Sequence, residues 1–433
     1  MGRLAPSSPE NASATDREDL SEEEIRLLIQ FMSEVGAAMN GAGDATTFIR
    51  RSLHRIARAY GLRHVEVFVV PTLLLLRYGN DRSTFVDLSS NIPTDLRLDQ
   101  IAALYDLVDD VEATRPSPVE GLVRLRAILR QPARFKTPAR ILALMLITGG
   151  IVLLLRPSWE EVALSLGLAL VVGVLKEGGS RWPALWPLVP ALAGLMVGSI
   201  SLLAIEQGLN CRPLQVLIPP LTIFLPGAAL TVSMIELANG DIVAGGSRLA
   251  YGATRLFLLV SGLVVAAGWT GIPPSTNVDS VQLTPLVPLV GLLLFSTGVF
   301  LHFSAPRGSF GWLLLVIAAA WIGQQMGSIL LGPYPGGFVG GAVMIVVASL
   351  IQDRPGAPPL IVSFTPAFWL LVPGAIGLEG LTQIVGQSPE SGIDEVVAMF
   401  VTMIAIALGV VFGLVISGSR RSLDPAEGMT TDR

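Results

Sequence analysis

The feature that most constrains this chain is a long apolar segment that begins at Ile141 and ends at Ser417. Of the 433 residues, 63 are charged, and 37 of these fall within the first 140 residues. The remaining 293 residues are only about 9% charged, whereas soluble globular proteins carry about 25%. The sequence therefore predicts a soluble-looking N-terminal domain joined to a membrane domain.

The length of the apolar segment limits the number of helices that it can hold. A membrane-spanning helix needs about 20 residues, so ten spans fit into the 277 residues with ordinary loops, whereas fourteen spans would leave no loops. The predicted spans are approximately 141–155, 161–175, 184–205, 214–237, 249–269, 286–303, 311–331, 338–351, 360–385 and 396–417.

Basic residues predict how these spans are oriented, because cytoplasmic loops are enriched in Lys and Arg. Residues 1–24 are polar and contain no apolar signal-peptide region, so we expect the N-terminus to stay in the cytoplasm. The outer edges of the spans then carry only Arg156 and Arg212. Eleven basic residues lie at the cytoplasmic edges: Arg134, Lys136, Arg140, Lys176, Arg181, Arg248, Arg255, Arg307, Arg354, Arg420 and Arg421. This distribution predicts a multi-pass protein of the cell inner (plasma) membrane with both termini in the cytoplasm.

A proline-rich segment occurs twice in the membrane domain. Residues 219–228 (PPLTIFLPGA) return as residues 366–375 (PAFWLLVPGA), at an offset of 147 and without a gap. The same offset carries span 1 onto span 6 and Gly245 onto Gly392. Because each copy would hold five spans, an odd number, the second copy must be inverted relative to the first. Inverted repeats are typical of secondary transporters, in which two similar halves move about a central site.

Both copies predict a broken helix in the middle of the membrane. Pro226 and Pro373 fall near the centres of spans 4 and 9, where a proline removes a helical hydrogen bond, and a glycine follows each of them. The half-helix after each Pro-Gly presents free N–H groups and a positive dipole end, which suit a carboxylate. We therefore expect substrate at Pro226, Gly227 and Ala228 and at Pro373, Gly374 and Ala375. The alternative is two kinks that only shape helix packing.

A few polar residues of the membrane domain are candidates for transport chemistry. Glu379 lies within span 9, six residues after Pro373, and could carry a coupling proton. Glu206 and Glu236 stand at the ends of spans 3 and 4, where we expect them to be solvated. The Thr231 hydroxyl could bind a hydroxyl or ammonium group of the substrate, although hydrogen bonding to its own helix is the simpler role.

The segment 236–249 (ELANGDIVAGGSRL) would close the cytoplasmic side of span 4. Opposite charges and three glycines predict a tight turn that Arg248 holds together. Glu236, Asp241 and Arg248 are therefore candidates for a cytoplasmic gate. The alternative is a well-capped loop.

The N-terminal region predicts a small cytoplasmic α+β domain. A capping box at Ser21 and Glu24 predicts the start of a first helix, and a second helix is expected around 45–60. Runs rich in β-formers at Val65–Val70, Thr72–Tyr78 and Thr84–Leu88 predict strands, and Leu96–Val111 and Pro118–Leu129 predict helices. The predicted organisation is a disordered tail (1–20), the α+β domain (21–137), membrane repeat 1 with spans 1–5 (138–270), membrane repeat 2 with spans 6–10 (286–418) and a cytoplasmic tail (419–433).

Several classes of function lack their motifs. We find no P-loop, GxSxG or HExxH sequence, and the single cysteine, Cys211, excludes CxxC sites within one chain. The three histidines are too scattered for a metal cluster, and a net charge of −5 gives no reason to expect nucleic acid. We therefore expect no enzyme activity, no cofactor and no metal. The expected partners are a small-molecule substrate, protons, the lipid bilayer and possible further copies of this chain.

The segment LPGAALT at 225–231, followed by Glu236-Leu, Gly240-Asp241, Gly245 and Arg248-Leu249, resembles the signature of the threonine/serine exporter family. Region 25–133 is similar to that family's cytoplasmic domain, and residues 288–417, with Leu371-Val-Pro373-Gly374, look like its C-terminal membrane half. The resemblance implies ten spans and export of threonine and serine driven by the proton-motive force. It departs from the family pattern at Glu236, where Asp is usual, and at Ala244, where Ser is usual.

The leading hypothesis is thus a proton-coupled antiporter that exports threonine, serine or similar small metabolites. Some relatives are associated with dicarboxylate export, which is one alternative. A channel or sensor with a ligand-binding cytoplasmic domain is another. A membrane hydrolase that uses the N-terminal domain is a third, and the absence of a nucleophile motif weighs against it.

Overall fold

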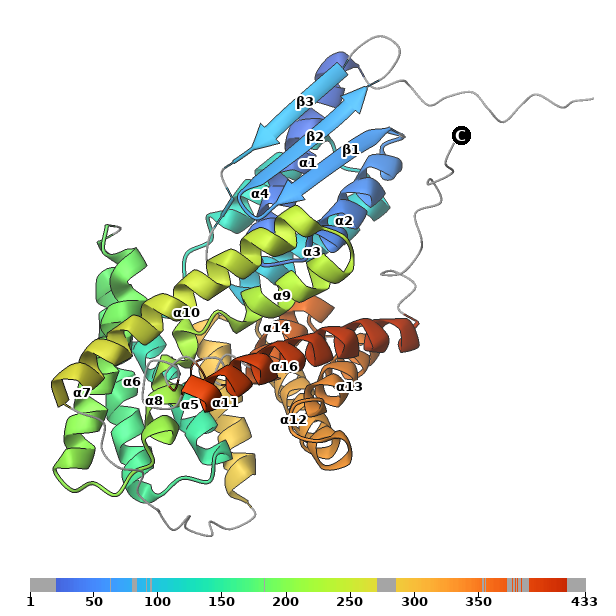
Figure 1. Cartoon of the computed structure of the whole chain (residues 1–433). Coiled ribbons are helices and arrows are strands. Elements are labelled where there is room, and N and C mark those ends of the chain that lie inside the picture. The colour runs from blue at the N-terminus through green and yellow to red at the C-terminus, as the bar shows by residue number, and fades with distance from the viewer. Residues whose placement is uncertain are drawn as a thin grey trace, which may run out of the picture.

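The structure is a computed structural model whose elements fall into an N-terminal unit and a long helical unit (Figure 1). It describes residues 21–418 apart from 63, 80–83, 91, 94–95, 183, 271–285, 353, 355, 372–375, 377, 379, 381–382 and 384–388. The N-terminal unit, residues 22–129, mixes helices and strands, and the helical unit, residues 137–416, contains no strand within its described residues.

The N-terminal unit contains every helix and strand predicted for it, with boundaries shifted by a few residues. Ser21 accepts from the Glu24 backbone N–H and Glu24 accepts from the Ser21 N–H, so the predicted capping box is confirmed. Ser117 caps the last helix, which has a proline at its first position. The elements are α1 (Glu22–Gly41), α2 (Thr46–Ala59), β1 (Val65–Val70), β2 (Leu73–Gly79), β3 (Thr84–Ser89), α3 (Leu98–Thr114) and α4 (Pro118–Leu129).

The three strands form an antiparallel sheet in the order β1-β2-β3 (Figure 1). Val67 pairs with Leu76 across β1 and β2, and Leu76 pairs with Asp87 across β2 and β3. One face of the sheet packs on α1 and α2, where Leu74 and Leu76 are fully buried, and α3 and α4 form a layer beyond these helices. The N-terminal unit thereby has a core of its own.

The helical unit is a series of apolar helices, and each predicted span overlaps at least one of them. The helices of the first predicted repeat are α5 (Thr137–Leu154), α6 (Trp159–Gly179), α7 (Val189–Glu206), α8 (Pro213–Leu221), α9 (Gly227–Ala238) and α10 (Ile242–Thr270). Those of the second are α11 (Val287–His302), α12 (Phe310–Leu331), α13 (Gly336–Ile351), α14 (Leu360–Leu371) and α16 (Pro389–Ile416).

Six of the described helical segments are long and apolar enough to cross a membrane, and the bent pair α8–α9 would make a seventh span. The remaining apolar helices, α11, α13 and α14, have 16, 16 and 12 described residues. The chain is therefore polytopic by length and composition. The predicted total of ten spans is a finer statement than this test reaches.

Glycines allow the long helices to approach closely. A Cβ atom added at Gly194 on α7 would collide with the Leu259 carbonyl on α10, and one added at Gly262 on α10 would collide with the Ala191 carbonyl on α7. Such contacts between backbones are typical of membrane helices, whose association depends on close packing rather than on exclusion of water.

The α13–α16 pair makes the same contacts 147 residues later. A Cβ atom at Gly341 would meet the Ile406 carbonyl, and one at Gly409 would meet the Phe338 carbonyl. Each of these four positions lies 147 residues after its counterpart in the α7–α10 pair. A third contact repeats as well, since Gly245 meets Ser233 in the first half and Gly380 meets Gly392 in the second. The offset found in the sequence is thus an offset between equivalent helix contacts.

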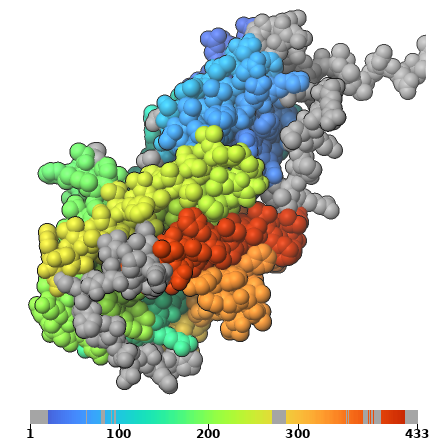
Figure 2. Space-filling view, in the orientation of Figure 1, coloured from blue at the N-terminus to red at the C-terminus, as the bar shows by residue number. Residues whose placement is uncertain are grey.

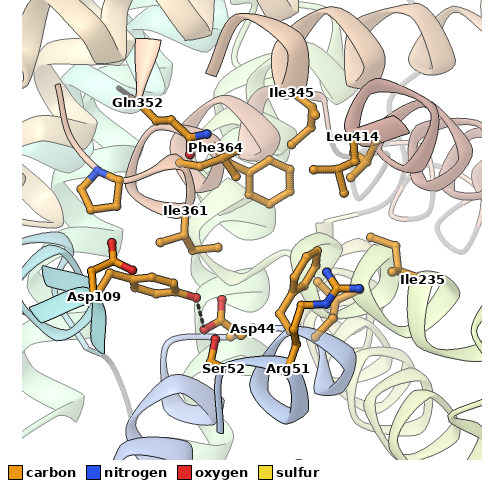
Figure 3. Close-up of a pocket in the computed structure, with 18 of the residues that line it drawn as sticks. Asp44, Arg51, Ser52, Asp109, Ile235, Ile345, Gln352, Ile361, Phe364 and Leu414 are labelled. Carbon is orange, nitrogen blue, oxygen red and sulfur yellow. Dashed lines mark hydrogen bonds between the residues drawn. The ribbon is translucent and has the colours of Figure 1, made fainter. Parts of the chain in front are cut away.

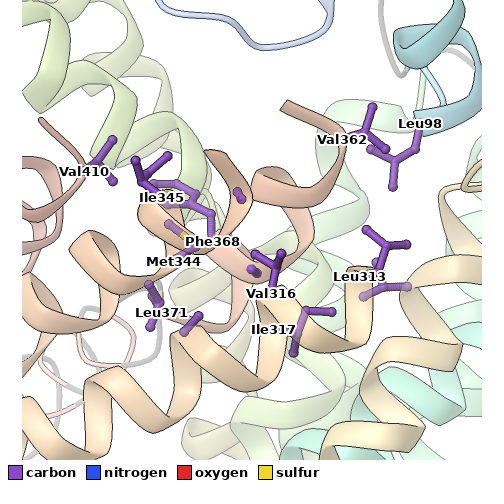
Figure 4. Close-up of a cluster of buried hydrophobic side chains, with 14 of the residues drawn as sticks. Leu98, Leu313, Val316, Ile317, Met344, Ile345, Val362, Phe368, Leu371 and Val410 are labelled. Carbon is purple, nitrogen blue, oxygen red and sulfur yellow. The ribbon is translucent and has the colours of Figure 1, made fainter. Parts of the chain in front are cut away.

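The N-terminal unit rests directly on the helical unit (Figure 2). A shared apolar cluster joins Leu98 and Ile101 of α3 to Leu313 of α12 and to Val362 of α14, as Figure 4 shows for Leu98 and Val362. The Leu98 N–H also donates to the Phe303 carbonyl, at 2.9 Å, just beyond α11. Both apolar packing and hydrogen bonds therefore fix the N-terminal unit against the helices.

The glycine contacts generate a testable prediction. Gly262→Ala and Gly409→Ala should each lower the thermal stability of the detergent-solubilised protein, because the new methyl group meets a backbone carbonyl and forces the helices apart. Overpacking of this kind typically destabilises a protein by about 1–3 kcal/mol.

Gly268→Ala on α10 is the matched control, since nothing lies within 4 Å of a Cβ atom at that position. We expect this substitution to be neutral or mildly stabilising, because alanine has the higher helix propensity. Melting temperatures measured in parallel would contradict the packing account if all three variants behaved alike.

Candidate functional site

A sharp break in the fourth predicted span is the first element of the candidate site. After α8 the chain makes one 3-10 turn, Thr222–Phe224, and α9 then begins at Gly227. The axes of the two halves differ by 66°. Pro226 explains the break, because it has no N–H to donate and its ring clashes with the preceding helical turn. The predicted break at Pro226 is therefore confirmed.

The start of α9 places polar groups in the protein interior. Pro226 and Gly227 are buried and Ala228 is half-buried, and no side chain caps the first turn of α9. The first N–H groups of a helix have no partner within the helix, so they are available to a ligand here. α9 packs against α10, α14 and α16, which places this helix end between the two halves of the helical unit.

Thr231 differs from the other hydroxyl residues around the break. Thr222, Ser233 and Thr365 donate to carbonyls of their own helices, at 3.1, 2.5 and 2.8 Å. The Thr231 hydroxyl is fully buried and has no hydrogen-bond partner among the described residues. Bonding to its own helix, the simpler role considered for Thr231, is therefore not what its side chain does.

The second predicted half of the site cannot be placed in the same way. Pro373, Gly374, Ala375 and Glu379 lie outside the described residues. α14, which precedes them, ends at Leu371. The convergence of two half-helices on one substrate, and the role of Glu379, stay predictions.

The far end of α9 carries a carboxylate that the sequence analysis placed in the wrong environment. Glu236 was expected to be solvated, but its side chain is completely buried. The Arg248 Nε lies 3.1 Å from both carboxylate oxygens, and the Thr46 backbone N–H donates to Oε1 at 3.2 Å. A buried carboxylate needs such partners, because an isolated charge in the interior is costly.

Arg248 in turn reaches into the N-terminal unit. Its Nη2 donates to the Asn40 Oδ1 at 3.2 Å and to the Asp44 carbonyl at 3.0 Å. Asn40 and Asp44 flank the loop between α1 and α2. The planar guanidinium group thereby joins α9, α10 and this loop at one point.

Asp241 makes a second set of contacts with the start of α2. Its Oδ2 accepts from the Thr46 hydroxyl at 2.7 Å and from the Thr47 hydroxyl at 3.3 Å, and it pairs with the Arg50 Nη2 at 2.8 Å. The three residues predicted to form a gate, Glu236, Asp241 and Arg248, therefore do lie together. Their partners are in the N-terminal unit, so they do more than hold a tight turn. We call this set of contacts the interdomain clamp.

A cavity of about 280 Å³ opens next to the clamp, between the N-terminal unit and the helices (Figure 3). Its polar wall comes from α2, α3 and the loop before α2, with Asp44, Ser52 and Tyr105 among its residues. Its apolar wall includes Ile361 and Phe364 of α14. The sequence analysis predicted neither the cavity nor its lining.

Asp44 is the most perturbed acid outside the membrane helices. It is 3% exposed, and its Oδ2 accepts from the Tyr105 hydroxyl at 2.6 Å. Burial raises the pKa of Asp44 to about 7, against the lowering effects of the Tyr105 hydrogen bond and the Arg248 charge. Burial and the neighbouring Asp44 likewise hold the pKa of Tyr105 well above 10. Asp44 can therefore gain or lose a proton near neutral pH.

The described residues contain no group of three His, Cys, Asp or Glu side chains that could hold a metal ion. The Asp109 and Asp110 carboxylates on α3 instead make ion pairs with Arg55, at 3.9 Å, and with Arg124, at 2.6 Å. What the site offers is hydrogen-bond donors, acceptors and charges.

Comparison with known proteins assigns the family. The sequence model of the threonine/serine exporter family matches residues 30–269, which is more than half of the chain. The chain belongs to the threonine/serine exporter family. A relative named threonine/serine exporter, from Corynebacterium glutamicum, is 21% identical over 422 residues, covering 90% of this chain and 82% of the relative. No solved structure matches the chain.

The family assignment applies to the regions that make up the clamp. The match includes most of the N-terminal unit, the broken helix α8–α9 and Glu236, Asp241 and Arg248. As a family member with several membrane-capable helices, the chain is a multi-pass membrane transport protein.

The clamp yields a prediction about stability. Arg248→Ala should strongly destabilise the exporter, by about 3–5 kcal/mol, because it leaves Glu236 buried without its counter-charge. Adding Glu236→Gln to this variant should restore part of the loss, since a neutral amide is less costly to bury. Melting temperatures of the two single variants and the double variant measure this coupling.

Arg255→Ala, two turns further along the same helix, is the control, because Arg255 is exposed and contacts only Tyr251 in the described structure. We expect little change there. A double variant no more stable than Arg248→Ala alone would show that the buried charge is not the cause.

Proposed function

We propose that this chain is a secondary active transporter that exports threonine, serine or similar small amino acids from the cytoplasm, driven by the proton-motive force. The observation that carries the proposal is the broken helix, whose second half begins at a buried Gly227 between the two predicted repeats. The family assignment supports amino-acid export as the cargo class. Proton coupling is the finer step and rests on Glu379.

The proposed architecture is ten spans in two inverted five-helix repeats, preceded by a cytoplasmic domain. Its support is the set of glycine contacts that recur at an offset of 147 in α7–α10 and α13–α16. An odd number of spans per repeat inverts the second copy, and such repeats can exchange two packings about a central axis. Both termini would then lie in the cytoplasm, and the membrane would be the inner (plasma) membrane.

In the proposed site, the substrate carboxylate lies at the start of α9, against the N–H groups of Gly227 and Ala228. Helix N-termini bind anions because their free N–H groups and dipole point at the ligand. The Thr231 hydroxyl, buried one turn further on, would bind the substrate hydroxyl or ammonium group. Pro373, Gly374 and Ala375 would supply the equivalent half-helix from the second repeat.

The interdomain clamp would act as the cytoplasmic gate. Glu236 ends the same half-helix whose first turn would hold the substrate, so a movement of α9 must change its contacts with Arg248 and Thr46. The cytoplasmic domain would thereby follow the transport cycle. This role extends the predicted gate of Glu236, Asp241 and Arg248 by naming what the gate holds.

Transport into proteoliposomes tests the proposal. Vesicles with an imposed pH gradient should concentrate labelled threonine or serine above the outside level, and Glu379→Gln should abolish this concentration because the coupling proton has no carrier. Glu206→Gln, at the exposed end of α7, is the matched control and should transport normally. The quantity measured is the ratio of internal to external substrate at steady state.

Two results would contradict the proposal. Flux that only dissipates a gradient would indicate a channel. Concentration of a dicarboxylate such as succinate, without threonine or serine, would move the protein to the dicarboxylate exporters, whose substrate also carries the carboxylate that the α9 end suits.

A further inference from the structure

The cavity beside the clamp has a composition that a packing defect would not show. One wall is polar and comes entirely from the N-terminal unit, whereas the other is apolar and comes from α9, α13, α14 and α16. Figure 3 shows Asp44 and Ser52 on the first wall facing Ile361 and Phe364 on the second. Ligand sites typically combine an apolar lining with a few convergent polar groups.

The polar wall offers an acid and a hydroxyl side by side. Asp44 is 3% exposed, and Tyr105 already donates to its Oδ2. Ser52 is 6% exposed, and its hydroxyl makes no hydrogen bond to any described residue. Because buried hydroxyl groups are normally paired, Ser52 is suited to a partner inside the cavity. Together the Asp44 carboxylate and the Ser52 hydroxyl form a site for an ammonium group.

The same wall also carries positive charge. Arg51 and Arg55 of α2 both line the cavity. Arg55 donates through Nη1 to Glu112 at 3.0 Å, but its Nε is buried without a partner among the described residues. Guanidinium groups are suited to planar carboxylates. The wall thus presents an acidic position and a basic position to one small space.

The opposite wall suits an aliphatic or aromatic group. Ile345, Ile361, Phe364 and Leu414 line it, and the lining residues contributed by α9, α13, α14 and α16 carry no charge. At about 30 Å³ for each water, the cavity holds on the order of nine waters. A free amino acid has a similar number of non-hydrogen atoms. Nucleotides and other large ligands do not fit.

We propose that this cavity is a binding site for a free α-amino acid, with its ammonium group at Asp44 and Ser52, its carboxylate toward Arg51 and Arg55, and its side chain against Ile361 and Phe364. This is a second site, distinct from the start of α9, and it does not require that the bound amino acid is the one transported. Since its two walls belong to the two units, a ligand there stabilises their docked arrangement.

The charge of Asp44 gives this site a dependence on pH. Burial raises its pKa to about 7, so at pH 6 most molecules carry a proton that an ammonium ligand must displace. The charged and titratable groups around it are Tyr105, Asp106 and Asp109 of α3, Arg51 and Arg55 of α2, and Arg248 of α10. Affinity should therefore rise by up to about tenfold between pH 6 and pH 8, as Asp44 becomes ionised without ligand.

Equilibrium binding of labelled amino acids to the purified full-length protein in detergent tests the site. A panel of threonine, serine, leucine and succinate identifies the ligand, and the amino acids should bind whereas succinate should not. Asp44→Asn should weaken binding at pH 8 by at least tenfold and remove the pH dependence. Ile361→Trp should also weaken binding by at least tenfold, by filling the cavity from the opposite wall.

Matched controls separate the cavity from general damage and from the transport site. Asp87→Asn, on β3 and away from the cavity, and Ile361→Met, of similar volume, should bind like the unaltered protein. Thr231→Val should leave binding at the cavity intact even if it impairs transport. The elution profile on size-exclusion chromatography shows whether Ile361→Trp folds, and Asp44→Asn, which keeps the side-chain shape, serves as the second test.

Absence of amino-acid binding to the unaltered protein would overturn the inference. Binding that is unaffected by Asp44→Asn and by a folded Ile361→Trp would also overturn it, because the ligand would then lie elsewhere. Failure of pH-driven transport with cavity binding retained would contradict the proposed exporter function but not this site.

Discussion

The structure depends on one buried ion pair, Glu236 with Arg248. A carboxylate with no exposed surface is stable only if its charge and lone pairs are satisfied, and the helical unit supplies Arg248 for this purpose. The remaining partners come from the N-terminal unit: the Thr46 N–H for Glu236, and Asn40 and the Asp44 carbonyl for Arg248. Breaking the contact between the units would leave both charges short of partners. The end of the broken helix and the N-terminal unit therefore form one electrostatic assembly.

Close helix packing is the second constraint, and the sequence contained most of the information needed to predict it. The recurrence of Pro-Gly at an offset of 147 predicted the break at Pro226, which the 66° bend confirms. The same offset relates the contact of Gly262 with Ala191 to that of Gly409 with Phe338, although those residues were not used to find it. A repeat is visible in sequence because equivalent positions face equivalent steric limits. The helices and strands of the N-terminal unit followed from caps and periodicity, which are local signals.

The parts that were not predicted depend on residues far apart in the chain. Glu236 was expected to be solvated because its position at a helix end says nothing about Thr46, which lies 190 residues earlier. Asp44 and Ser52 read as ordinary loop and helix residues until the fold placed α14 opposite them. Periodicity shows which face of an element is apolar but not which other element covers it. The cavity, which exists only between the two units, leaves no local signal.

Cross-linking the clamp tests most directly whether the N-terminal unit takes part in transport. In a Cys211→Ala background, Thr47→Cys and Asp241→Cys place two thiols where the native side chains lie 3.3 Å apart, and a short bifunctional thiol reagent can join them. If the clamp must open during each cycle, threonine transport in proteoliposomes should fall to background on cross-linking and recover when a reducible linker is cleaved. The double variant without reagent is the reference. Undiminished transport with complete cross-linking would contradict the account.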